Sequence, residues 1–323
     1  MELTDKMGRK IRYLRLSVTD RCNQRCIYCM PEEGIEFTSR GNVLPLENLS
    51  RLAARFVDIF EIDKIRLTGG EPLIRKNIEF LIETLLRMPG IKEITLTTNG
   101  ILLTEKAECL FSAGLNRINV SLDSLNPDKY SYITGGSRLE DILNGLNVAR
   151  EVGFDPIKIN TVLLPGFNEA REFVEWSNGE GYIVRFIEFM PPAAQTRVDI
   201  KGSGPVQTDI LRELEGVFGK AEEKGTSGDD QGKVARRFGF AENDFVFEVI
   251  PATSDPFCGT CNRIRIDCKG DLRACLYSDD TLELKNLIDA PDGEFIAAIT
   301  DFVGQKAERK LKHIGCNMSS IGG

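Results

Sequence analysis

A strand-then-helix alternation occupies the first two thirds of the 323-residue sequence. Six segments rich in β-formers are separated by stretches with apolar residues at helical spacing. The predicted strands span residues 11–19, 64–67, 93–98, 117–123, 157–164 and 183–190. The predicted helices that follow the first five strands span residues 46–60, 77–88, 104–113, 138–152 and 169–178. Because a full (β/α)8 barrel needs eight strands, the pattern predicts an α/β fold with an open, partial (β/α)6 TIM-like barrel.

The pattern changes after Pro192, and this change divides the chain in two. Residues 1–192 form the predicted barrel core, and residues 193–323 form a C-terminal region that we expect to cover its open side. In this region the sequence predicts a helix at 209–218, a strand at 245–250 and largely helical structure over 282–312.

Composition limits the classes of function that this chain can have. With 41% hydrophobic and 28% charged residues it is an ordinary globular sequence. The net charge of −8 argues against bulk binding to nucleic acid, which requires a basic surface. The sequence has no apolar run near the ~20 residues of a membrane span and no apolar core of a signal peptide. We therefore expect no membrane association and a cytoplasmic location.

Three cysteines directly follow the first predicted strand: Cys22, Cys26 and Cys29. They lie at the carboxyl end of that strand, where parallel α/β folds build their active sites. Thiolates suit iron–sulfur clusters, zinc or copper(I). Since a four-iron cluster or a structural zinc site normally takes four protein ligands, three cysteines leave one metal position open to a substrate or cofactor. The alternative is a structural zinc site with a distant fourth ligand.

A second cysteine group lies in the C-terminal region: Cys258, Cys261 and Cys275, with Cys268 between the last two. These four thiols together fit a structural zinc site. Two arginines argue against this alternative. Arg263 and Arg265 come shortly after Cys261, and residues two apart on a strand face the same way. Arginine forks match phosphate oxygens, so the pair indicates an anion site. With His313 as the single histidine, zinc catalysis based on histidine and a Ser-His-Asp triad are both disfavoured.

Further candidates lie on the predicted strands and at their ends. Arg15, Lys64, Arg66 and Lys158 would form a site for a highly anionic ligand such as a triphosphate if they point into the barrel. Periodicity alone does not decide whether they point inward or outward. The pair Gly69-Gly70 either lets the backbone approach a ligand or forms a tight turn.

These motifs resemble the radical S-adenosylmethionine (SAM) superfamily. The resemblance rests on the C-x3-C-x2-C spacing after a strand, on Tyr28 before the last cysteine and on Gly-Gly-Glu-Pro after the next strand. Within that superfamily the chain is most similar to the GTP 3′,8-cyclase family (molybdenum cofactor biosynthesis protein A). The matching runs include LRLSVTDRC, RLTGGEPL and FCGTCNRIR, together with the terminal pair Gly322-Gly323.

The resemblance implies two [4Fe–4S] clusters and SAM as cofactors. It assigns one cluster, which binds SAM, to Cys22, Cys26 and Cys29, and a second, which binds the guanine of GTP, to Cys258, Cys261 and Cys275. It assigns contacts with SAM to Tyr28, Gly70, Ser121 and Met190. It assigns contacts with GTP to Arg15, Arg66, Thr97, Lys158, Arg263 and Arg265, and less firmly to Lys64 and Arg185. It also implies that Gly322 and Gly323 reach the active site, while we expect Cys268 to be a free thiol.

The implied reaction converts GTP to (8S)-3′,8-cyclo-7,8-dihydroguanosine 5′-triphosphate. In it, a 5′-deoxyadenosyl radical removes the ribose 3′ hydrogen and the ribose carbon then attacks C8 of guanine. The implied partners are a reductant and a downstream cyclic pyranopterin monophosphate synthase, and relatives are often homodimers. Two alternatives stand beside this interpretation: a radical SAM enzyme of peptide maturation, and a non-catalytic iron–sulfur or zinc protein.

Overall fold

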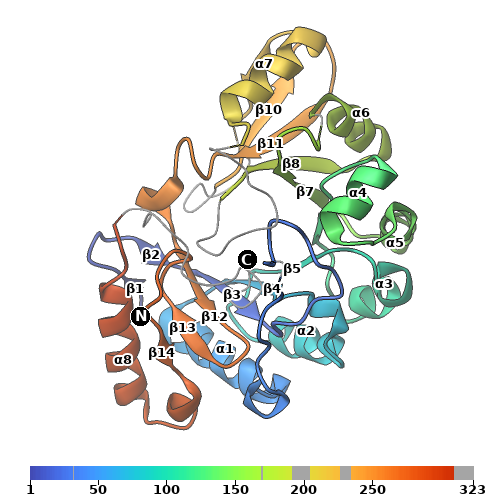
Figure 1. Ribbon diagram of the computed structural model, residues 1–323. Helices are drawn as coiled ribbons and strands as arrows, with labels where there is room; N and C mark the ends of the chain where they lie inside the picture. Colours follow the sequence, from blue (N-terminus) through green and yellow to red (C-terminus); the bar gives the residue numbers. More distant parts are fainter. Residues whose placement is uncertain (32, 169, 191–203, 226–233, 309–323) are drawn as a thin grey trace.

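The computed structural model describes residues 1–31, 33–168, 170–190, 204–225 and 234–308. Its main feature is one sheet of 12 strands in the order β14-β13-β12-β3-β4-β5-β6-β7-β8-β11-β10-β9 (Figure 1). The short strands β1 (Leu3–Thr4) and β2 (Lys10–Ile11) form a separate antiparallel ribbon. None of the helices in these ranges combines the length and the apolar character that crossing a bilayer requires.

Six consecutive parallel strands form the core of the sheet, which confirms the predicted partial barrel. They are β3 (Tyr13–Ser17), β4 (Lys64–Thr68), β5 (Glu93–Thr98), β6 (Ile118–Ser121), β7 (Ile157–Leu163) and β8 (Ile183–Glu188). The crossover helices α1 (Leu46–Phe60), α2 (Ile78–Leu86), α3 (Leu103–Ser112), α5 (Leu139–Val152) and α6 (Ala170–Glu180) lie outside these strands (Figure 1). The outermost strands of the sheet, β14 and β9, are not paired with each other, so the barrel is open.

Alternation along the strands separates an apolar outer face from a polar inner face. On β3, Leu14 and Leu16 are fully buried in the core shared with the helices, whereas Tyr13 and Arg15 point the other way and line an internal cavity. The helices present matching apolar stripes, such as Leu49, Leu52 and Phe56 on α1. Full burial of each such side chain contributes roughly 1.5–3 kcal/mol, so this layer fixes which face of each strand points inward.

The C-terminal region adds one parallel strand to each edge of the six-stranded core. Strand β11 (Val246–Ile250) pairs with β8, and β12 (Arg263–Ile266) pairs with β3. The other C-terminal elements are α7 (Gln207–Phe218), β9 (Ala221–Glu223), β10 (Arg236–Phe240), β13 (Asp271–Arg273), β14 (Leu282–Glu283) and α8 (Asp292–Gly304). The region thus widens the barrel sheet itself as well as covering its open side.

The structure refines one prediction of secondary structure and adds one helix that was not predicted. The described part of 282–312 is largely helical, but β14 comes first, a short 3-10 helix (Lys285–Leu287) follows, and α8 begins only after Pro291. Residues 309–312 lie outside the described ranges. The sequence analysis also missed helix α4 (Pro127–Thr134), although its start carries clear signals: Pro127 in the first turn and Asn126, whose side chain accepts bonds from two backbone N–H groups.

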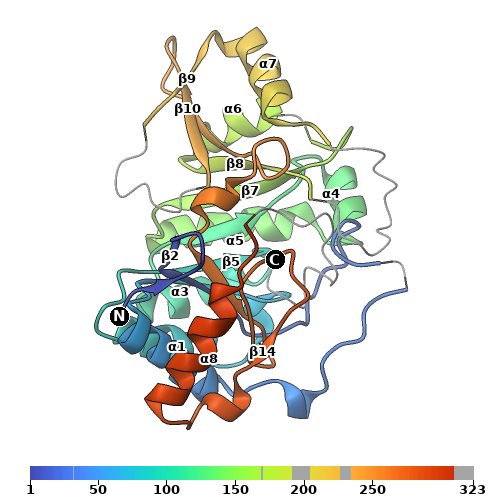
Figure 2. The same cartoon turned by 90° about the vertical axis from the view of Figure 1, so that its left-hand side faces the viewer.

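Helix α8 docks on α1 through aromatic rings. The Phe295 ring lies 5.4 Å from that of Phe56 and 6.1 Å from that of Phe60, and the Arg55 guanidinium sits 4.1 Å from its centroid. Figure 2 shows the two helices side by side, as Figure 1 does. Phe295 therefore connects the end of the described chain to the first crossover helix.

We expect Phe295→Ala to lower the free energy of unfolding by about 3–5 kcal/mol, because it empties a fully buried ring site. As a control, Phe80→Ala on α2 removes a ring that is 47% exposed and should change stability by about 0.5 kcal/mol or less. Anaerobic urea unfolding of both variants measures the difference. Similar losses in the two variants would contradict this account of the interface.

Candidate active site

One cavity of about 650 Å³ fills the inside of the open barrel and is lined by both cysteine groups. The first group, Cys22, Cys26 and Cys29, follows the carboxyl end of β3. The second precedes β12 and follows β13; since β12 runs parallel to β3 and β13 runs antiparallel to it, these cysteines lie at the amino ends of the barrel strands. The two groups therefore lie at opposite ends of the barrel strands. Strand β3, which runs between these ends, has five residues and spans roughly 13 Å at about 3.3 Å per residue.

The first cysteine loop is held by backbone contacts on two sides. The N–H groups of Arg25 and Ile27 donate to carbonyls at the end of α4, at 2.9 Å each. On the other side, Gly70 N–H donates to the Thr19 carbonyl at 2.7 Å. A Cβ at Gly70 would lie 2.1 Å from the Arg21 carbonyl oxygen, and one at Gly69 would lie 2.5 Å from the Thr19 oxygen. Both positions therefore require glycine because two backbone segments pass close to each other there. The sequence had suggested instead that the backbone approaches a ligand or forms a tight turn.

The thiols of the first group are difficult to ionise without a nearby cation. Burial raises the pKa of Cys26 well above its ordinary value, and the negative charges of Cys29 and Asp123 raise it further. Burial also raises the pKa of Cys22. Metal ions bind thiolates and compensate this charge, so three thiols on one loop, with the pKa values of Cys22 and Cys26 raised, fit an iron–sulfur cluster.

Among the described residues, no three or more His, Cys, Asp or Glu side chains converge closely enough to hold a single metal ion. A tetrahedral zinc site would need its sulfurs about 2.3 Å from one ion. A four-iron cluster takes each thiolate at a different iron, so its sulfurs lie farther apart. Thiols that do not converge on a single point are compatible with a cluster.

Two buried carboxyl groups that the sequence analysis did not assign support this edge of the cavity. Glu71 accepts bonds from Leu73 N–H (2.9 Å), the Thr98 hydroxyl (2.7 Å) and Asn99 N–H (2.7 Å), and so joins the ends of β4 and β5. Burial raises its pKa to about 7 even though these bonds oppose the shift. Its position in Gly-Gly-Glu-Pro was the signal that could have identified it.

Asp123, the second of these carboxyl groups, holds the cysteine loop in place through its hydrogen bonds. It accepts a bond of 2.7 Å from the Tyr28 hydroxyl and one of 2.8 Å from Val162 N–H. Burial raises the pKa of Asp123 to about 6, while the bond from Tyr28 opposes that rise. Asn99 both caps the following turn through Ile101 N–H (3.2 Å) and donates to Asn23 in the cysteine loop (2.7 Å). These bonds fix the loop against the ends of three strands.

Between the two edges lies a row of arginines on adjacent strands. Arg265 of β12 pairs in register with Arg15 of β3, and Arg15 pairs with Arg66 of β4. Burial lowers the pKa of Arg15 well below its ordinary value, and the charges of Arg265 and Arg66 lower it further. Burial likewise lowers the pKa of Arg265 to about 10, with Arg263 adding to the effect. The arginines remain cationic at neutral pH but would be stabilised by an anion.

The row continues into polar groups that suit a nucleotide-sized ligand. Arg66 Nε donates to the Thr95 hydroxyl at 3.0 Å, and the guanidinium groups of Arg66 and Arg263 lie 5.6 and 5.4 Å from the Tyr13 ring centroid. Thr97 Oγ1 and Asn160 Oδ1 are buried with no hydrogen-bond partner among the residues that the structure describes. Since buried polar groups are nearly always satisfied, both atoms indicate a missing ligand.

On the opposite wall, the cations are already paired. Glu248 of β11 accepts from Lys158 Nζ at 2.7 Å and from Arg185 Nη2 at 2.7 Å. Burial, aided by the charge of Arg185, lowers the pKa of Lys158 to about 8. The sequence analysis missed Glu248, and the signal was one acidic residue in the otherwise apolar strand VFEVI. Lys158 and Arg185 therefore act together with a carboxylate, whereas the sequence analysis had considered them as cations alone.

At the second cysteine group, positive charge favours the thiolate form. Burial alone would raise the pKa of Cys261, but the charges of Lys306 and Arg263 lower it overall. Cys268 is different: it does not line the cavity, it is 1% exposed, and burial raises its pKa to about 12. Its neighbours are Asp20 and Thr38. The four-cysteine zinc alternative therefore lacks its fourth ligand in this geometry.

Every site residue predicted from the sequence and present in the described ranges lines this one cavity. These are Cys22, Cys26, Cys29, Cys258, Cys261, Cys275, Tyr28, Gly70, Ser121, Met190, Arg15, Arg66, Thr97, Lys158, Arg263 and Arg265, with Lys64 and Arg185. Periodicity did not decide whether the strand cations Arg15, Lys64, Arg66 and Lys158 point inward or outward. The structure shows that all four point into the cavity. Gly322, Gly323 and His313 lie outside the described residues.

Comparisons with known proteins agree with this geometry. Residues 16–176 match the Radical SAM superfamily, and residues 182–312 match Molybdenum Cofactor Synthesis C. A GTP 3′,8-cyclase of Geobacter sulfurreducens is 40% identical over the whole of both chains. Another, from Peptoclostridium acidaminophilum, is 43% identical over 87% of this chain and 85% of its own.

Solved structures share the fold at low sequence identity. The crystal structure of Streptococcus suis SuiB bound to S-adenosylmethionine superposes with a TM-score of 0.66 at 16% identity, covering 91% of this chain and 67% of SuiB. The structure of anSMEcpe with bound AdoMet has a TM-score of 0.51 at 18% identity, over 64% of this chain and 57% of that one.

The contact between Gly70 and the cysteine loop generates a test. Gly70→Ala must displace the Arg21 carbonyl, so we expect a loss of about 1–3 kcal/mol of stability and reduced iron retention after anaerobic purification. Gly41→Ala is the matched control, because no atom lies within 4 Å of its added Cβ. Iron analysis and thermal unfolding compare the two. Equal behaviour of both variants would show that the contact is not needed.

Proposed function

The chain belongs to the GTP 3′,8-cyclase family of radical SAM enzymes, and on that premise we propose how its cavity carries out the family's reaction. The enzyme is a radical SAM cyclase of molybdenum cofactor biosynthesis, with SAM and two iron–sulfur clusters as cofactors and GTP as substrate. This match over the full chain excludes the non-catalytic alternative. It also excludes the peptide-maturation alternative, because the relatives that match most of the chain at about 40% identity are GTP 3′,8-cyclases.

The observation that carries the proposal is the single cavity with a cysteine group at each edge and arginines between them. We assign the SAM-binding cluster to Cys22, Cys26 and Cys29, and SAM contacts to Tyr28, Gly70, Ser121 and Met190. When bound, this cluster supplies one-electron cleavage of SAM, the source of the 5′-deoxyadenosyl radical. The chain's own part is to hold the loop rigid, through Gly70 on one side and the Tyr28–Asp123 bond on the other.

We assign the second cluster to Cys258, Cys261 and Cys275, whose open iron would bind the guanine of GTP. The triphosphate would lie along the cationic wall, contacted by Arg15, Arg66, Arg263 and Arg265, with Thr97 as a further polar contact and Lys158 reaching it from the opposite wall. The lowered pKa of Arg15 supports this arrangement, because the negative charge of a triphosphate would offset the repulsion from Arg265 and Arg66.

Holding both ends of the substrate brings its ribose between the two edges of the barrel. Anchoring the guanine and the phosphates would fix the 3′ carbon near the radical source. Binding would then supply much of the entropy cost of bringing the reacting atoms together, which lowers the barrier. The walls also exclude water, which protects a carbon radical until it reaches C8 of guanine. In this proposal the chain positions and shields, and the cofactors supply the difficult chemistry.

We further propose a division of labour at residue 192. The core of residues 1–192 would bind SAM, and residues 193–323 would bring the second cluster and the Gly322-Gly323 tail to the substrate. The resemblance also supports a reductant, a downstream cyclic pyranopterin monophosphate synthase and a homodimer. The eight described cysteines are all free thiols, which supports a reducing cytoplasm as the location.

Cysteine variants test the assignment of both clusters. We expect Cys22→Ala and Cys258→Ala each to lose about four irons per chain relative to the parent protein. Cys22→Ala should cleave no SAM, whereas Cys258→Ala should still cleave SAM but form no cyclised GTP. The controls are Cys268→Ala and Cys109→Ala, the latter on helix α3 outside the cavity lining, and both should keep about eight irons. Anaerobic iron and product analysis measures these outcomes, and a loss of four irons from Cys268→Ala would refute the assignment of the second group.

The pH dependence of GTP binding tests the role of Lys158. Its ammonium is the form that attracts phosphate, and with a pKa of about 8 it neutralises as the pH rises. The dissociation constant for GTP should therefore increase roughly fourfold between pH 7 and pH 8.5. Lys158→Arg keeps its charge over this range and should show no such increase from this position. Anaerobic calorimetry compares the two proteins, and parallel pH profiles would exclude Lys158 as a phosphate contact.

A further inference from the structure

Lys306 is a buried cation beside the second cysteine group, and neither the sequence motifs nor the comparisons assign it a role. Lys306 lies just after the end of α8. Its side chain lines the cavity, and the residue is only 3% exposed. Its ammonium donates to two backbone carbonyls, that of Arg263 at 2.6 Å and that of Ala274. Arg263 lies two residues after Cys261, and Ala274 directly precedes Cys275. One ammonium thus joins the two segments that carry these cysteines.

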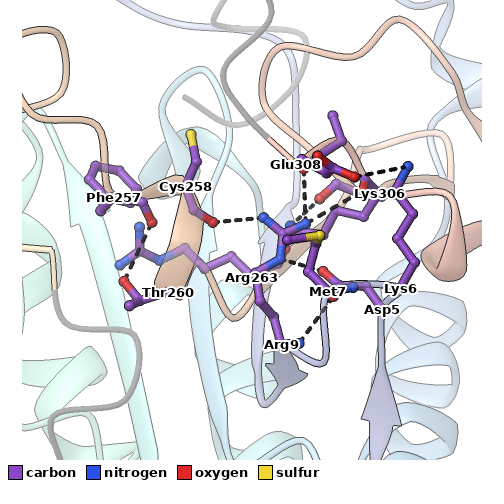
Figure 3. A network of polar contacts seen from close by, with 12 residues as sticks. Asp5, Lys6, Met7, Arg9, Phe257, Cys258, Thr260, Arg263, Lys306 and Glu308 are labelled. Carbon is purple, nitrogen blue, oxygen red and sulfur yellow. Dashed lines mark hydrogen bonds and ion pairs between the residues drawn. The ribbon is translucent and has the colours of Figure 1, made fainter.

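Arg9 holds the segment of the third cysteine. Its Nη1 donates to the Cys258 carbonyl at 2.7 Å, and its Nη2 donates to the Ala307 carbonyl, next to Lys306, at 2.9 Å. Figure 3 shows Arg9 between Asp5, Cys258 and the Lys306 segment. The two segments that carry the three cysteines, residues 258–263 and 274–275, are therefore tied together by two buried cations.

The two cations differ in their charge balance. Arg9 forms a buried ion pair with Asp5, so its charge is compensated locally. Within the described ranges, the Lys306 ammonium has only carbonyl acceptors and no salt bridge. A buried charge without a counter-ion is costly, and a neutral carbonyl does not cancel it. The groups that can carry negative charge near Lys306 are the thiols of Cys261 and Cys275 and the carboxylate of Asp5, which is already paired with Arg9. Against the effect of burial, the charge of Lys306 lowers the pKa of Cys261.

We propose that Lys306 is a positioning residue for the second cysteine group, and that its fixed charge favours the reduced, more negative state of the cluster held there. This inference rests on the proposed assignment of Cys258, Cys261 and Cys275 to a cluster. The charge near a cluster is among the factors that set its reduction potential. Lys306 would supply a positive charge, and its bonds to two carbonyls would fix the spacing of the two segments that carry the ligands.

The experiment isolates the second cluster in the full-length chain. In a Cys22→Ala, Cys26→Ala, Cys29→Ala background, only the second group can hold iron. Lys306→Gln is then added, because the amide can still donate to carbonyls but carries no charge. Lys306→Arg keeps the charge, and Lys6→Gln removes an equal charge from a side chain that is 52% exposed, where solvent screens it. Anaerobic redox titration with electron paramagnetic resonance and iron analysis follow the cluster, with no GTP added.

We expect Lys306→Gln to lower the equilibrium constant for one-electron reduction at least tenfold, which corresponds to 59 mV. Lys306→Arg and Lys6→Gln should stay within threefold of the background protein. Loss of the cluster in Lys306→Gln with retention in Lys306→Arg would equally support a role for the charge. A constant within threefold in Lys306→Gln, or loss of iron in both Lys306 variants, would overturn the inference. Absence of iron from the background protein would instead refute the proposed function.

Discussion

The in-register row Arg265–Arg15–Arg66 is the constraint on which the rest of the site depends. Side chains of parallel strands in register stand beside one another, so three guanidinium groups share one buried wall. Burial and the neighbouring charges of Arg265 and Arg66 lower the pKa of Arg15. In the proposed function an anionic substrate would offset this repulsion, so the wall would favour highly charged ligands before any base or sugar contact is made.

That row exists only because strands from distant parts of the chain join one sheet. Strand β12 brings Arg263 and Arg265 to β3, and β11 brings Glu248 to β8. The two edges of the core thus receive opposite charges: arginines at one, and at the other a carboxylate that pairs with Lys158 and Arg185. The result is a cavity with a strongly cationic wall facing a balanced one, which gives a polyphosphate one preferred side.

The two ends of the barrel, where the strands begin and where they finish, also carry different groups. The carboxyl edge, usual for active sites of this architecture, carries the first cysteine group, held by Gly70 and Asp123. The amino edge, usually a stability face, carries the second group, held by Lys306 and Arg9. The cavity therefore runs through the barrel from one end of the strands to the other, with a cysteine group at each end in place of a packed barrel interior.

The sequence by itself determined the six parallel strands, the two cysteine groups and the family, because these depend on local spacing and on apolar periodicity. It did not determine that Arg15, Arg66 and Lys158 point inward, since a side chain's face depends on which helices cover the other side of its strand. Nor did it identify Glu248 or Lys306, whose partners lie far away along the chain. Only the tertiary structure decided these points, and with them the separation of Cys268 from the three cysteines around it in sequence, because burial and charge pairing are properties of assembled strands.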